Sequence, residues 1–383
     1  MDCEDGSDED HCSTNCDLSD SKFLCKSSEE CISLDKVCNG VSDCHDGSDE
    51  GNGCDEKKTN DSCKDLKCGG NCILLPTGPT CVCEQGYSFN NESKLCEDIN
   101  ECSRYGICSQ QCVNTKGSYI CTCAKGFRLN KDNRSCDSMS LNVQLIFTSK
   151  KYIKKITLNT NFHELVQHTR RPVGVTFDGD YYYWTEVASD KEAIVKMHVD
   201  STKKEILFSS GLELPEDIAI DWLTKNVYFT DSSRNHIAVC TNDGFYCTEL
   251  VKSPEMEKVR AIALYPTESL MFWSDWGADA HIGVSFMDGS DAKILITDVA
   301  WPNGLTLDWP NGRIYWIDAR NRQIESATIQ GFDRRVILRD VFKHPFSIAV
   351  FGNRLYWSDK GTQAIEYCDK FTGKNHDVLT QGS

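Results

Sequence analysis

The sequence predicts a multidomain, mainly β protein in which small disulfide-rich modules are followed by a six-bladed β-propeller. Three observations support this fold class. Twenty of the 23 cysteines lie in residues 1–137, a four-residue aromatic motif recurs six times beyond that segment, and its copies are about 40 residues apart. No run of 18 apolar residues is present, so the sequence itself predicts no membrane-spanning helix.

The cysteine-dense segment is Gly-rich and poor in apolar runs. It cannot bury enough core to fold unaided, so we expect disulfides or metal ions to stabilise it in an oxidising compartment. The remaining 246 residues are long enough for one large hydrophobic domain. No secretory signal precedes Cys3, and we expect a piece from the middle of a longer secreted or membrane-anchored chain.

The net charge of −17 is uneven, because residues 1–55 contain 16 acidic and 3 basic side chains. Nucleic acid is disfavoured as a partner, since its phosphates would be repelled. Metal cations and basic protein surfaces are favoured instead. The alternative, that these acidic residues only solvate a loop, depends on their spacing.

A short acidic segment, DCEDGSDE at residues 2–9, recurs as DCHDGSDE at residues 43–50. The second copy lies in a six-cysteine unit, residues 13–55. This unit resembles a low-density lipoprotein (LDL) receptor class A repeat, whose signature is Cys-x-Asp-Gly-x-Asp-Glu. Sequence alone allows 15 pairings of six cysteines. The resemblance implies Cys16–Cys31, Cys25–Cys44 and Cys38–Cys54.

The first copy keeps only Cys3 and Cys12. We therefore interpret residues 1–12 as the C-terminal remnant of a second class A repeat, whose other cysteines lie upstream.

Two further six-cysteine units follow, at residues 59–97 and 98–137. Both have a Cys-x-Cys pair followed by Gly and an aromatic residue, and both resemble EGF-like modules. Zinc binding is the alternative to disulfides for closely spaced cysteines, but a zinc site usually has four ligands in Cys-x-x-Cys pairs. Two units of six cysteines fit disulfides better. The cysteines expected to form disulfides are Cys63, Cys68, Cys72, Cys81, Cys83 and Cys96 in the first unit, and Cys102, Cys108, Cys112, Cys121, Cys123 and Cys136 in the second.

From Leu141 onward, short β-branched and aromatic segments alternate with turn residues. One motif recurs, and its second-position aromatics are 37, 45, 44, 43 and 41 residues apart. Six copies at this period predict a ring of four-stranded blades. The copies are Ile146–Ser149, Tyr183–Glu186, Tyr228–Asp231, Phe272–Asp275, Tyr315–Asp318 and Tyr356–Asp359.

A second element, a strand that begins with Pro, precedes four of the motifs, at Pro172, Pro215, Pro302 and Pro345. Together the two elements resemble the YWTD propeller of the LDL-receptor family, which we place at residues 138–383. The first motif lacks such a strand. Either residues upstream of Leu145 supply it, or the chain ends before it.

The class A resemblance implies a calcium site, because a repeat this small needs an oxygen cage to fold. The implied side-chain ligands are Asn39, Asp43, Asp49 and Glu50, with the carbonyls of Lys36 and Val41. Family repeats that bind ligand best have an aromatic residue where this chain has Lys36, and Asp where it has Asn39. We therefore expect this repeat to bind calcium but to contribute little to ligand capture.

The second EGF-like unit matches the calcium-binding EGF pattern. Its implied ligands are the side chains of Asp98, Glu101 and Asn114 and the carbonyls of Ile99, Thr115 and Ser118. The first unit has Ser62 where Glu would be needed, so we expect no metal there.

Other residues have mainly structural interpretations. We expect the motif tryptophans, such as Trp273, Trp316 and Trp357, to pack the sheets, and the motif aspartates to satisfy backbone donors between blades. Cys240 and Cys247 flank a tight turn and could bridge a hairpin. Cys368 is at the position equivalent to Cys240 but no cysteine follows it, so we expect it to be either free or paired beyond residue 383. Sequons occur at Asn60, Asn91 and Asn133.

His344 corresponds to a family position implicated in acid-triggered release, and histidine changes charge near endosomal pH. The alternative is an ordinary histidine that caps a strand. The family's other propeller histidine corresponds to Arg322, which is charged already at neutral pH.

The module order resembles that of endocytic receptors. It implies binding of lipoprotein or yolk-protein cargo with a basic surface, release in acidic endosomes through a contact between class A repeats and propeller, and a single-pass type I membrane protein at the cell surface. The alternative is a signalling co-receptor or matrix-binding protein that uses the propeller face. We expect no enzyme, since no G-x-S-x-G, HExxH or phosphate loop occurs.

Overall fold

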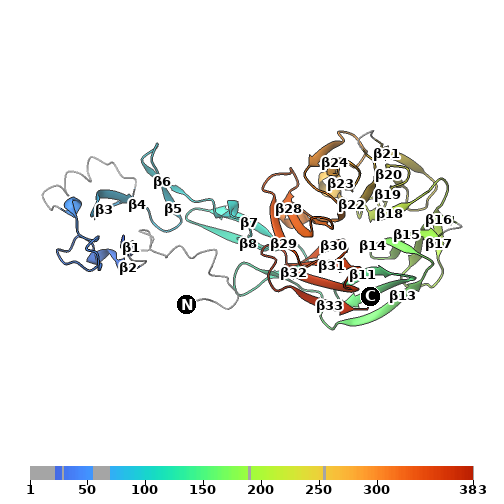
Figure 1. The fold of residues 1–383 in the computed structure, drawn as a ribbon, viewed down its shortest axis with the longest axis horizontal. Coiled ribbons are helices and arrows are strands. Elements are labelled where there is room, and N and C mark those ends of the chain that lie inside the picture. Colours follow the sequence, from blue (N-terminus) through green and yellow to red (C-terminus); the bar gives the residue numbers. More distant parts are fainter. Residues whose placement is uncertain (1–21, 28–29, 55–69, 189–190, 253–255, 383) are drawn as a thin grey trace. The chain divides into compact units, whose positions relative to one another are not determined.

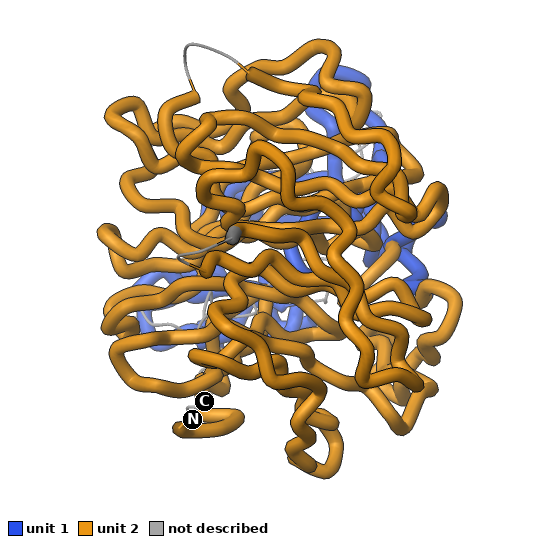
Figure 2. The backbone as a smooth tube through the Cα atoms, turned by 90° about the vertical axis from the view of Figure 1, so that its right-hand side faces the viewer, with its two compact units in different colours: residues 1–108, 112–122 blue, residues 109–111, 123–383 orange. Residues whose placement is uncertain are grey.

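The computed structural model describes residues 22–27, 30–54, 70–188, 191–252 and 256–382 (Figure 1). It divides into two compact units, residues 1–108 with 112–122 and residues 109–111 with 123–383 (Figure 2). The division passes through the second EGF-like module. Within the described residues, no helix is long and apolar enough to cross a bilayer.

The first unit consists of two-stranded hairpins held by disulfides. Its elements are β1 (Lys22–Leu24), β2 (Cys31–Ser33), η3 (Leu34–Lys36), η4 (Asn52–Cys54), β3 (Asn71–Leu75), β4 (Gly78–Val82), β5 (Tyr87–Asn90), β6 (Leu95–Asp98), η5 (Glu101–Ser103), β7 (Gln111–Thr115) and β8 (Ser118–Thr122). A small core forms where Ile32 and Val37 of the class A module meet Leu75 of the first EGF-like module. The two modules therefore share apolar burial that neither could supply alone.

Disulfides provide most of the remaining cross-linking. Those of the first unit are Cys25–Cys44, Cys38–Cys54, Cys83–Cys96, Cys102–Cys112 and Cys108–Cys121. Cys16, Cys63 and Cys68 lie outside the described residues, so the disulfides expected for these cysteines lie outside them as well. Cys3, Cys12, Asn60 and Ser62 are also outside the described residues.

The second unit is a propeller of six sheets. Blade 1 has β11 (Gln144–Ser149), β12 (Tyr152–Thr157) and β13 (Phe162–His168), and blade 2 has β14 (Pro172–Phe177), β15 (Tyr181–Ala188), β16 (Lys191–His198) and β17 (Glu205–Phe208). Blade 3 has β18 (Pro215–Ile220), β19 (Val227–Asp231), β20 (His236–Cys240) and β21 (Cys247–Val251), and blade 4 has β22 (Val259–Tyr265), β23 (Leu270–Asp275), β24 (His281–Phe286) and β25 (Lys293–Ile296). Blade 5 has β26 (Pro302–Asp308), β27 (Arg313–Asp318), β28 (Gln323–Thr328) and β29 (Arg335–Arg339), and blade 6 has β30 (Pro345–Phe351), β31 (Arg354–Asp359), β32 (Ala364–Asp369) and β33 (Asp377–Gln381).

The first strands of all six blades line a central cavity of about 1450 Å³. The first strands of blades 2 to 6 consist of residues that precede the motif. In these blades the motif strand comes second, behind the cavity-lining strand, and its aromatic residue is almost fully buried. Blade 1 differs, because β11 carries its motif and opens its sheet. Phe147 is consequently only half-buried, whereas Trp184 and Trp316 are completely buried. In the described chain upstream of β11, β10 (Cys136–Ser138) pairs with β9 (Phe127–Leu129) and not with blade 1.

The motif aspartates accept hydrogen bonds from the linker that leads into their own blade. Asp318, for example, accepts from the backbone N–H groups of Ala300 (2.6 Å) and Trp301 (3.1 Å). The motif hydroxyls join neighbouring blades, since Thr230 accepts from the N–H of Asp217 and donates to the carbonyl of Arg260 in the next blade. The motif thus fixes the spacing between blades as well as their packing.

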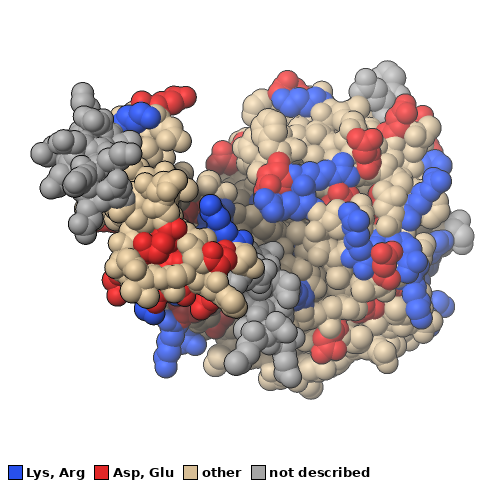
Figure 3. Space-filling view, turned by 60° about the vertical axis from the view of Figure 1, so that its left-hand side comes forward, with Lys and Arg blue, Asp and Glu red and all other residues tan. Residues whose placement is uncertain are grey.

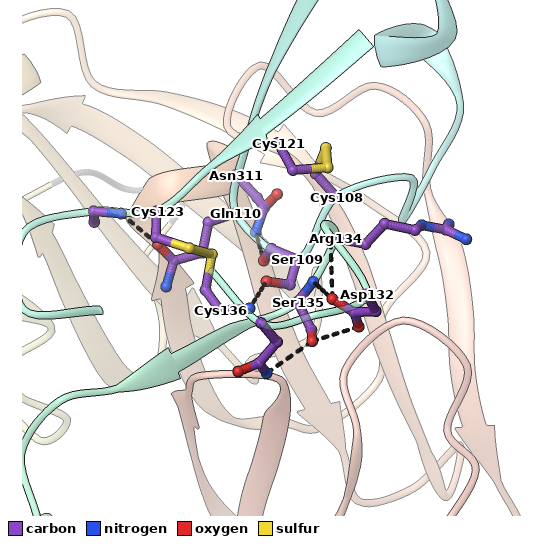
Figure 4. Close-up of a disulfide and its surroundings, with 12 residues drawn as sticks. Cys108, Ser109, Gln110, Cys121, Cys123, Asp132, Arg134, Ser135, Cys136 and Asn311 are labelled. Atoms are coloured by element: carbon purple, nitrogen blue, oxygen red, sulfur yellow. Dashed lines mark hydrogen bonds between the residues drawn. A yellow bond between two sulfur atoms is a disulfide. The ribbon is translucent and has the colours of Figure 1, made fainter. Parts of the chain in front are cut away.

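The last part of the second EGF-like module belongs to the propeller unit (Figure 4). The side chain of Asn311, from the turn after β26, donates to the carbonyl of Ser109 at 2.9 Å. The Ser109 hydroxyl in turn accepts from the N–H of Cys136 at 2.8 Å, and Cys136 is bonded to Cys123. Phe127 packs on Phe351, with ring centroids 5.6 Å apart. The Asn311 hydrogen bond and the aromatic pair therefore anchor this segment to the blades, while the disulfide cross-links the segment itself.

Candidate calcium sites and propeller surface

The four side chains expected to bind calcium in the class A module lie on one loop between η3 and η4. Asn39 Nδ2 donates to Asp43 Oδ2 at 2.9 Å. Asp49 is fully buried, and its carboxylate accepts from the backbone N–H of Asp43 at 2.6 Å. Glu50 Oε1 accepts from the N–H of Gly40 at 3.0 Å. The loop thus gathers an oxygen-rich donor set, the kind that calcium prefers.

Lys36 contributes an ammonium group to this loop. Its Nζ lies 3.3 Å from Asp43 Oδ1, and its side chain is half-exposed. The hydrogen bond from Asn39, and then the contact with Lys36, lower the pKa of Asp43 below its ordinary value. A cation therefore already neighbours this carboxylate, and the Lys36 side chain is exposed enough to leave it for solvent. The expected carbonyl ligand Val41 is on the same loop, with its N–H bonded to Asn39 Oδ1.

Asp46 is a loop residue that our sequence reasoning did not single out. Its carboxylate accepts from the backbone N–H groups of Ser27 (2.7 Å) and Ser48 (3.0 Å). Hydrogen bonding from Ser48 is the main cause that holds the pKa of Asp46 well below its usual range. Asp46 therefore ties the loop to the β1–β2 hairpin. The Asp-Gly-Ser turn was the available signal.

The expected calcium site of the second EGF-like module also forms a cluster. Asp98, at the end of β6, accepts from Asn114 Nδ2 at 2.7 Å and from the N–H of Gly117 at 2.5 Å. Glu101 begins η5, and its Oε2 is buried without a hydrogen-bond partner in the described chain. An unpaired buried carboxylate oxygen is costly unless a cation binds it. This set of residues therefore fits a calcium ion.

The remaining expected ligands of this site are backbone carbonyls on the same turns. Ile99 lies between Asp98 and η5, while Thr115 and Ser118 flank the β7–β8 turn, where the Thr115 hydroxyl donates to the Ser118 carbonyl at 2.9 Å. In the part of the chain that is described, no three His, Cys, Asp or Glu side chains converge as they would around a bound metal. The fit therefore rests on the mixed set of carboxylate, amide and carbonyl oxygens.

His344 is exposed and lies in the linker into blade 6. Its backbone N–H donates to Asp359 at 2.9 Å, which fixes the main chain and leaves the imidazole at the surface. Arg322 has a different environment. Its guanidinium donates to the carbonyls of Asp340 and Phe342 and so supports the linker that carries His344. The two positions are therefore not equivalent in this chain.

A charged cluster at the cavity mouth escaped sequence reasoning, because its residues come from separate blades and lie outside the motif. Arg260 pairs with Glu216 at 3.2 Å and stacks on the Phe346 ring at 4.5 Å, while Lys360 lies 3.5 Å from the centroid of that ring. Burial lowers the pKa of both Arg260 and Lys360. Burial also raises the pKa of neighbouring Asp217 to about 6. Two cations thus share one aromatic ring beside a single paired carboxylate.

The three cysteines of the propeller proper are all accounted for. Cys240 and Cys247 form a disulfide across the β20–β21 hairpin. Cys368 is a free thiol and fully buried, and burial raises its pKa to about 12. The thiol is therefore unreactive at physiological pH. The sequon residues Asn91 and Asn133 are exposed.

Comparison with known proteins identifies the family. The model for low-density lipoprotein receptor repeat class B matches residues 269–309 and 312–351, that for the class A domain matches 14–54, and that for the coagulation factor Xa inhibitory site matches 102–136. A human low-density lipoprotein receptor-related protein 5-like protein is 31% identical over 201 residues, which cover 52% of this chain and 78% of that protein. The chain belongs to the low-density lipoprotein receptor family.

Within this family, two vitellogenin receptors are similar over most of the chain. That of Solenopsis invicta is 42% identical over 83% of the chain, and vitellogenin receptor Yl of Drosophila melanogaster is 39% identical over 97%. The chain spans only 18% and 19% of their lengths. The propeller also resembles a chain in the crystal structure of a nidogen/laminin complex, with 26% identity, a TM-score of 0.58, and 61% of this chain and 92% of that chain covered. These LDL-receptor-family relatives are membrane receptors with extracellular domains, and class A repeats in general bind calcium.

Proposed function

We propose that this chain is part of the extracellular region of an endocytic receptor for lipoprotein or yolk-protein cargo. The observation that carries this proposal is the similarity to a vitellogenin receptor over 97% of the chain. The receptor would be a single-pass type I membrane protein that works at the cell surface and in endosomes. The proposed modules are residues 1–12, 13–55, 59–97, 98–137 and 138–383.

Calcium would be bound at two places in this receptor. The loop that contains Asp43 and Glu50 would hold one ion, and the cluster of Asp98, Glu101 and Asn114 would hold the other. The acidic class A repeats would attract cargo with a basic surface. Lys36 would make this particular repeat a weak contributor, because it would repel a lysine of the cargo.

Acid release would depend on a contact between class A repeats and propeller. His344 is exposed, so a proton gained in the endosome would present a new positive charge to acidic repeats. An exposed charge pair of this kind is worth up to about 1 kcal/mol. That would change the balance between open and closed receptor several-fold, and loss of calcium in the endosome would add to it.

The test uses the whole receptor that contains this chain, expressed on cultured cells and supplied with labelled vitellogenin. We expect calcium-dependent uptake, and release at endosomal pH that is slower in His344→Ala than in wild type. His163→Ala is the matched control, because His163 is an exposed histidine on blade 1. Equal release by all three receptors would remove His344 from the mechanism, and no uptake would refute the proposed function.

The charged cluster at the cavity mouth favours a second candidate, a receptor that binds a partner through its propeller face. On the side of the molecule shown in Figure 3, Lys and Arg side chains are interspersed with Asp and Glu. Binding of a cargo protein that is lost in Lys360→Met but retained in Lys293→Met, an exposed lysine of blade 4, would support this alternative.

A further inference from the structure

We propose that Asn39 is a site of self-modification, in which the calcium-free protein converts the Asn39 amide to a carboxylate and bound calcium suppresses the reaction. Asn39 and Gly40 are both exposed. Gly40 has φ +85°, and a Cβ at this position would meet nothing within 4 Å. The peptide link after Asn39 therefore has the freedom and the space that ring closure requires.

The reaction is an intramolecular cyclisation followed by hydrolysis. The backbone nitrogen of Gly40 attacks Cγ of Asn39, its proton passes to water, and the side-chain nitrogen leaves as ammonia. Water then opens the five-membered imide at either carbonyl. The net change is asparagine plus water to ammonia plus aspartate, or plus isoaspartate, in which the backbone runs through the side-chain carbon. No oxidant or further reactant is needed.

Three hydrogen bonds engage the three groups that react. The N–H of Gly40, the nucleophile, donates to Glu50 Oε1 at 3.0 Å, which polarises it. Asn39 Oδ1 accepts from the N–H of Val41 at 2.7 Å, where negative charge develops during the attack. Asn39 Nδ2, the leaving group, donates to Asp43 Oδ2 at 2.9 Å. The loop therefore restrains all three reacting groups and stabilises the charge that develops on Asn39 Oδ1.

The chain contains three other Asn-Gly pairs, and none has these contacts. The N–H of Gly53, after Asn52, donates to the Pro76 carbonyl instead of to a carboxylate. Asn303 is buried on β26, and its amide is bonded to the Pro345 carbonyl. The Asn311 amide donates to Ser109 and Asp308. These pairs are internal controls, and we expect Asn39 to react fastest.

We expect calcium to affect this reaction because Asn39, Asp43 and Glu50 are three of its proposed ligands. This part of the inference rests on the proposed function. A bound ion would take the oxygens that polarise the reacting groups and would hold the Asn39 amide away from Gly40. The aspartate product adds a carboxylate to the cage and strengthens calcium binding. The isoaspartate product lengthens the loop backbone and weakens it.

The test is peptide mapping by mass spectrometry on the intact 383-residue chain with its disulfides formed, incubated in isotopically labelled water with chelator or with calcium. With chelator, we expect label in the Asn39 peptide before the peptides of Asn52, Asn303 and Asn311. Free calcium at ten times the dissociation constant leaves about one molecule in eleven ion-free, so the reaction should slow about tenfold. Asn39→Gln should remove the label from this peptide, because the longer side chain closes its ring poorly.

The outcomes separate the two proposals. Labelling of Asn52 as fast as Asn39 would overturn the self-modification site, even if calcium binds. Fast labelling of Asn39 that calcium does not slow would support the reactive loop and would overturn the calcium site. The purified Asn39→Asp variant should bind calcium more tightly than wild type, and weaker binding by this variant would overturn the expected gain.

Discussion

The side-chain amide of Asn303 donates a hydrogen bond to the carbonyl oxygen of Pro345 at 2.8 Å and thereby joins blade 5 to blade 6. In blade 3 the same kind of link is made by a motif hydroxyl, Thr230 to the Arg260 carbonyl. Blade 5 has Ile317 at that motif position, which can donate nothing. A side chain outside the motif thus replaces the missing hydroxyl.

Replacing Asn303 should weaken the contact between blades 5 and 6. Asn303→Ala leaves the Pro345 carbonyl and the Arg260 guanidinium without this partner, which should cost about 1–3 kcal/mol of unfolding free energy. Denaturant unfolding followed by tryptophan fluorescence measures it. Adding Ile317→Thr should recover part of the loss by restoring the motif hydroxyl. A second substitution that only lowers stability further would contradict this assignment.

The ion pair of Lys370 with Asp308 should be worth far more than the surface pairs. Its atoms are 2.6 Å apart and both side chains are almost fully buried. Lys370→Met leaves a buried carboxylate without its cation, and we expect a loss of about 3–5 kcal/mol in thermal or denaturant unfolding. Lys293→Met is the control, because the side chains of Lys293 and its partner Asp291 are both exposed, and this change should cost less than about 1 kcal/mol. Equal effects would refute this ranking.

Asp217 should make the propeller more stable in mild acid. Its folded-state pKa of about 6 lies above its ordinary value of 3.8, because burial disfavours the charged form. The folded state therefore binds the proton more tightly, and stability rises as the pH falls through 6 toward 3.8. Since Asp217 keeps some exposure to the cavity, we expect a gain of about 1–2 kcal/mol.

The gain is measured as the change in melting temperature between neutral pH and about pH 5. The same change in Asp217→Asn is subtracted from that of wild type. The variant loses one acceptor oxygen at both pH values, so only its pH dependence is informative. Asp243→Asn is the control, because Asp243 is exposed on the β20–β21 turn. An unchanged pH dependence in Asp217→Asn would mean that another group is responsible.

Calcium titration calorimetry of the whole chain should detect two sites. Glu50→Gln should remove the first, and Glu101→Gln should remove the second, since each loses a charged oxygen ligand. Glu92→Gln, an exposed glutamate of the first EGF-like module, should leave both. Chelation should also make the disulfides of the class A module easier to reduce, because the small core of this module depends on the ion. No sites, or three, would overturn the assignment.

Asp98 should stiffen the joint between the two EGF-like modules. It links the end of β6 to Gly117, and a Cβ on Gly86 of the first module would lie only 2.1 Å from the Gly117 carbonyl oxygen. Asp98→Ala should increase backbone mobility at this joint in NMR relaxation, with calcium present, and leave the melting temperature of the propeller unchanged. A coincident loss of propeller stability would show that the boundary near residue 138 is misplaced.

Local patterns predicted much of the candidate sites. The clustering of Asp43 with Glu50, and of Asp98 with Asn114, could be predicted from the family resemblance of short segments, because these residues lie within single loops or adjacent turns. The role of Asp46 could also have been predicted from the Asp-Gly-Ser turn that it begins. The cavity-mouth cluster could not be predicted from the sequence, because Glu216, Arg260 and Lys360 come together only when separate blades close around one axis.

The sequence by itself determined the modular order, the six-bladed ring and the loops that gather carboxylates, because each follows from a local period or spacing. The tertiary structure alone decided that Phe147 stays half-buried where its blade opens on the motif strand, that Asn303 takes over for Ile317, and that Lys370 is buried beside Asp308. The last two outcomes depend on contacts between residues more than 40 positions apart, and burial and pairing across blades cannot be read from neighbours in the chain.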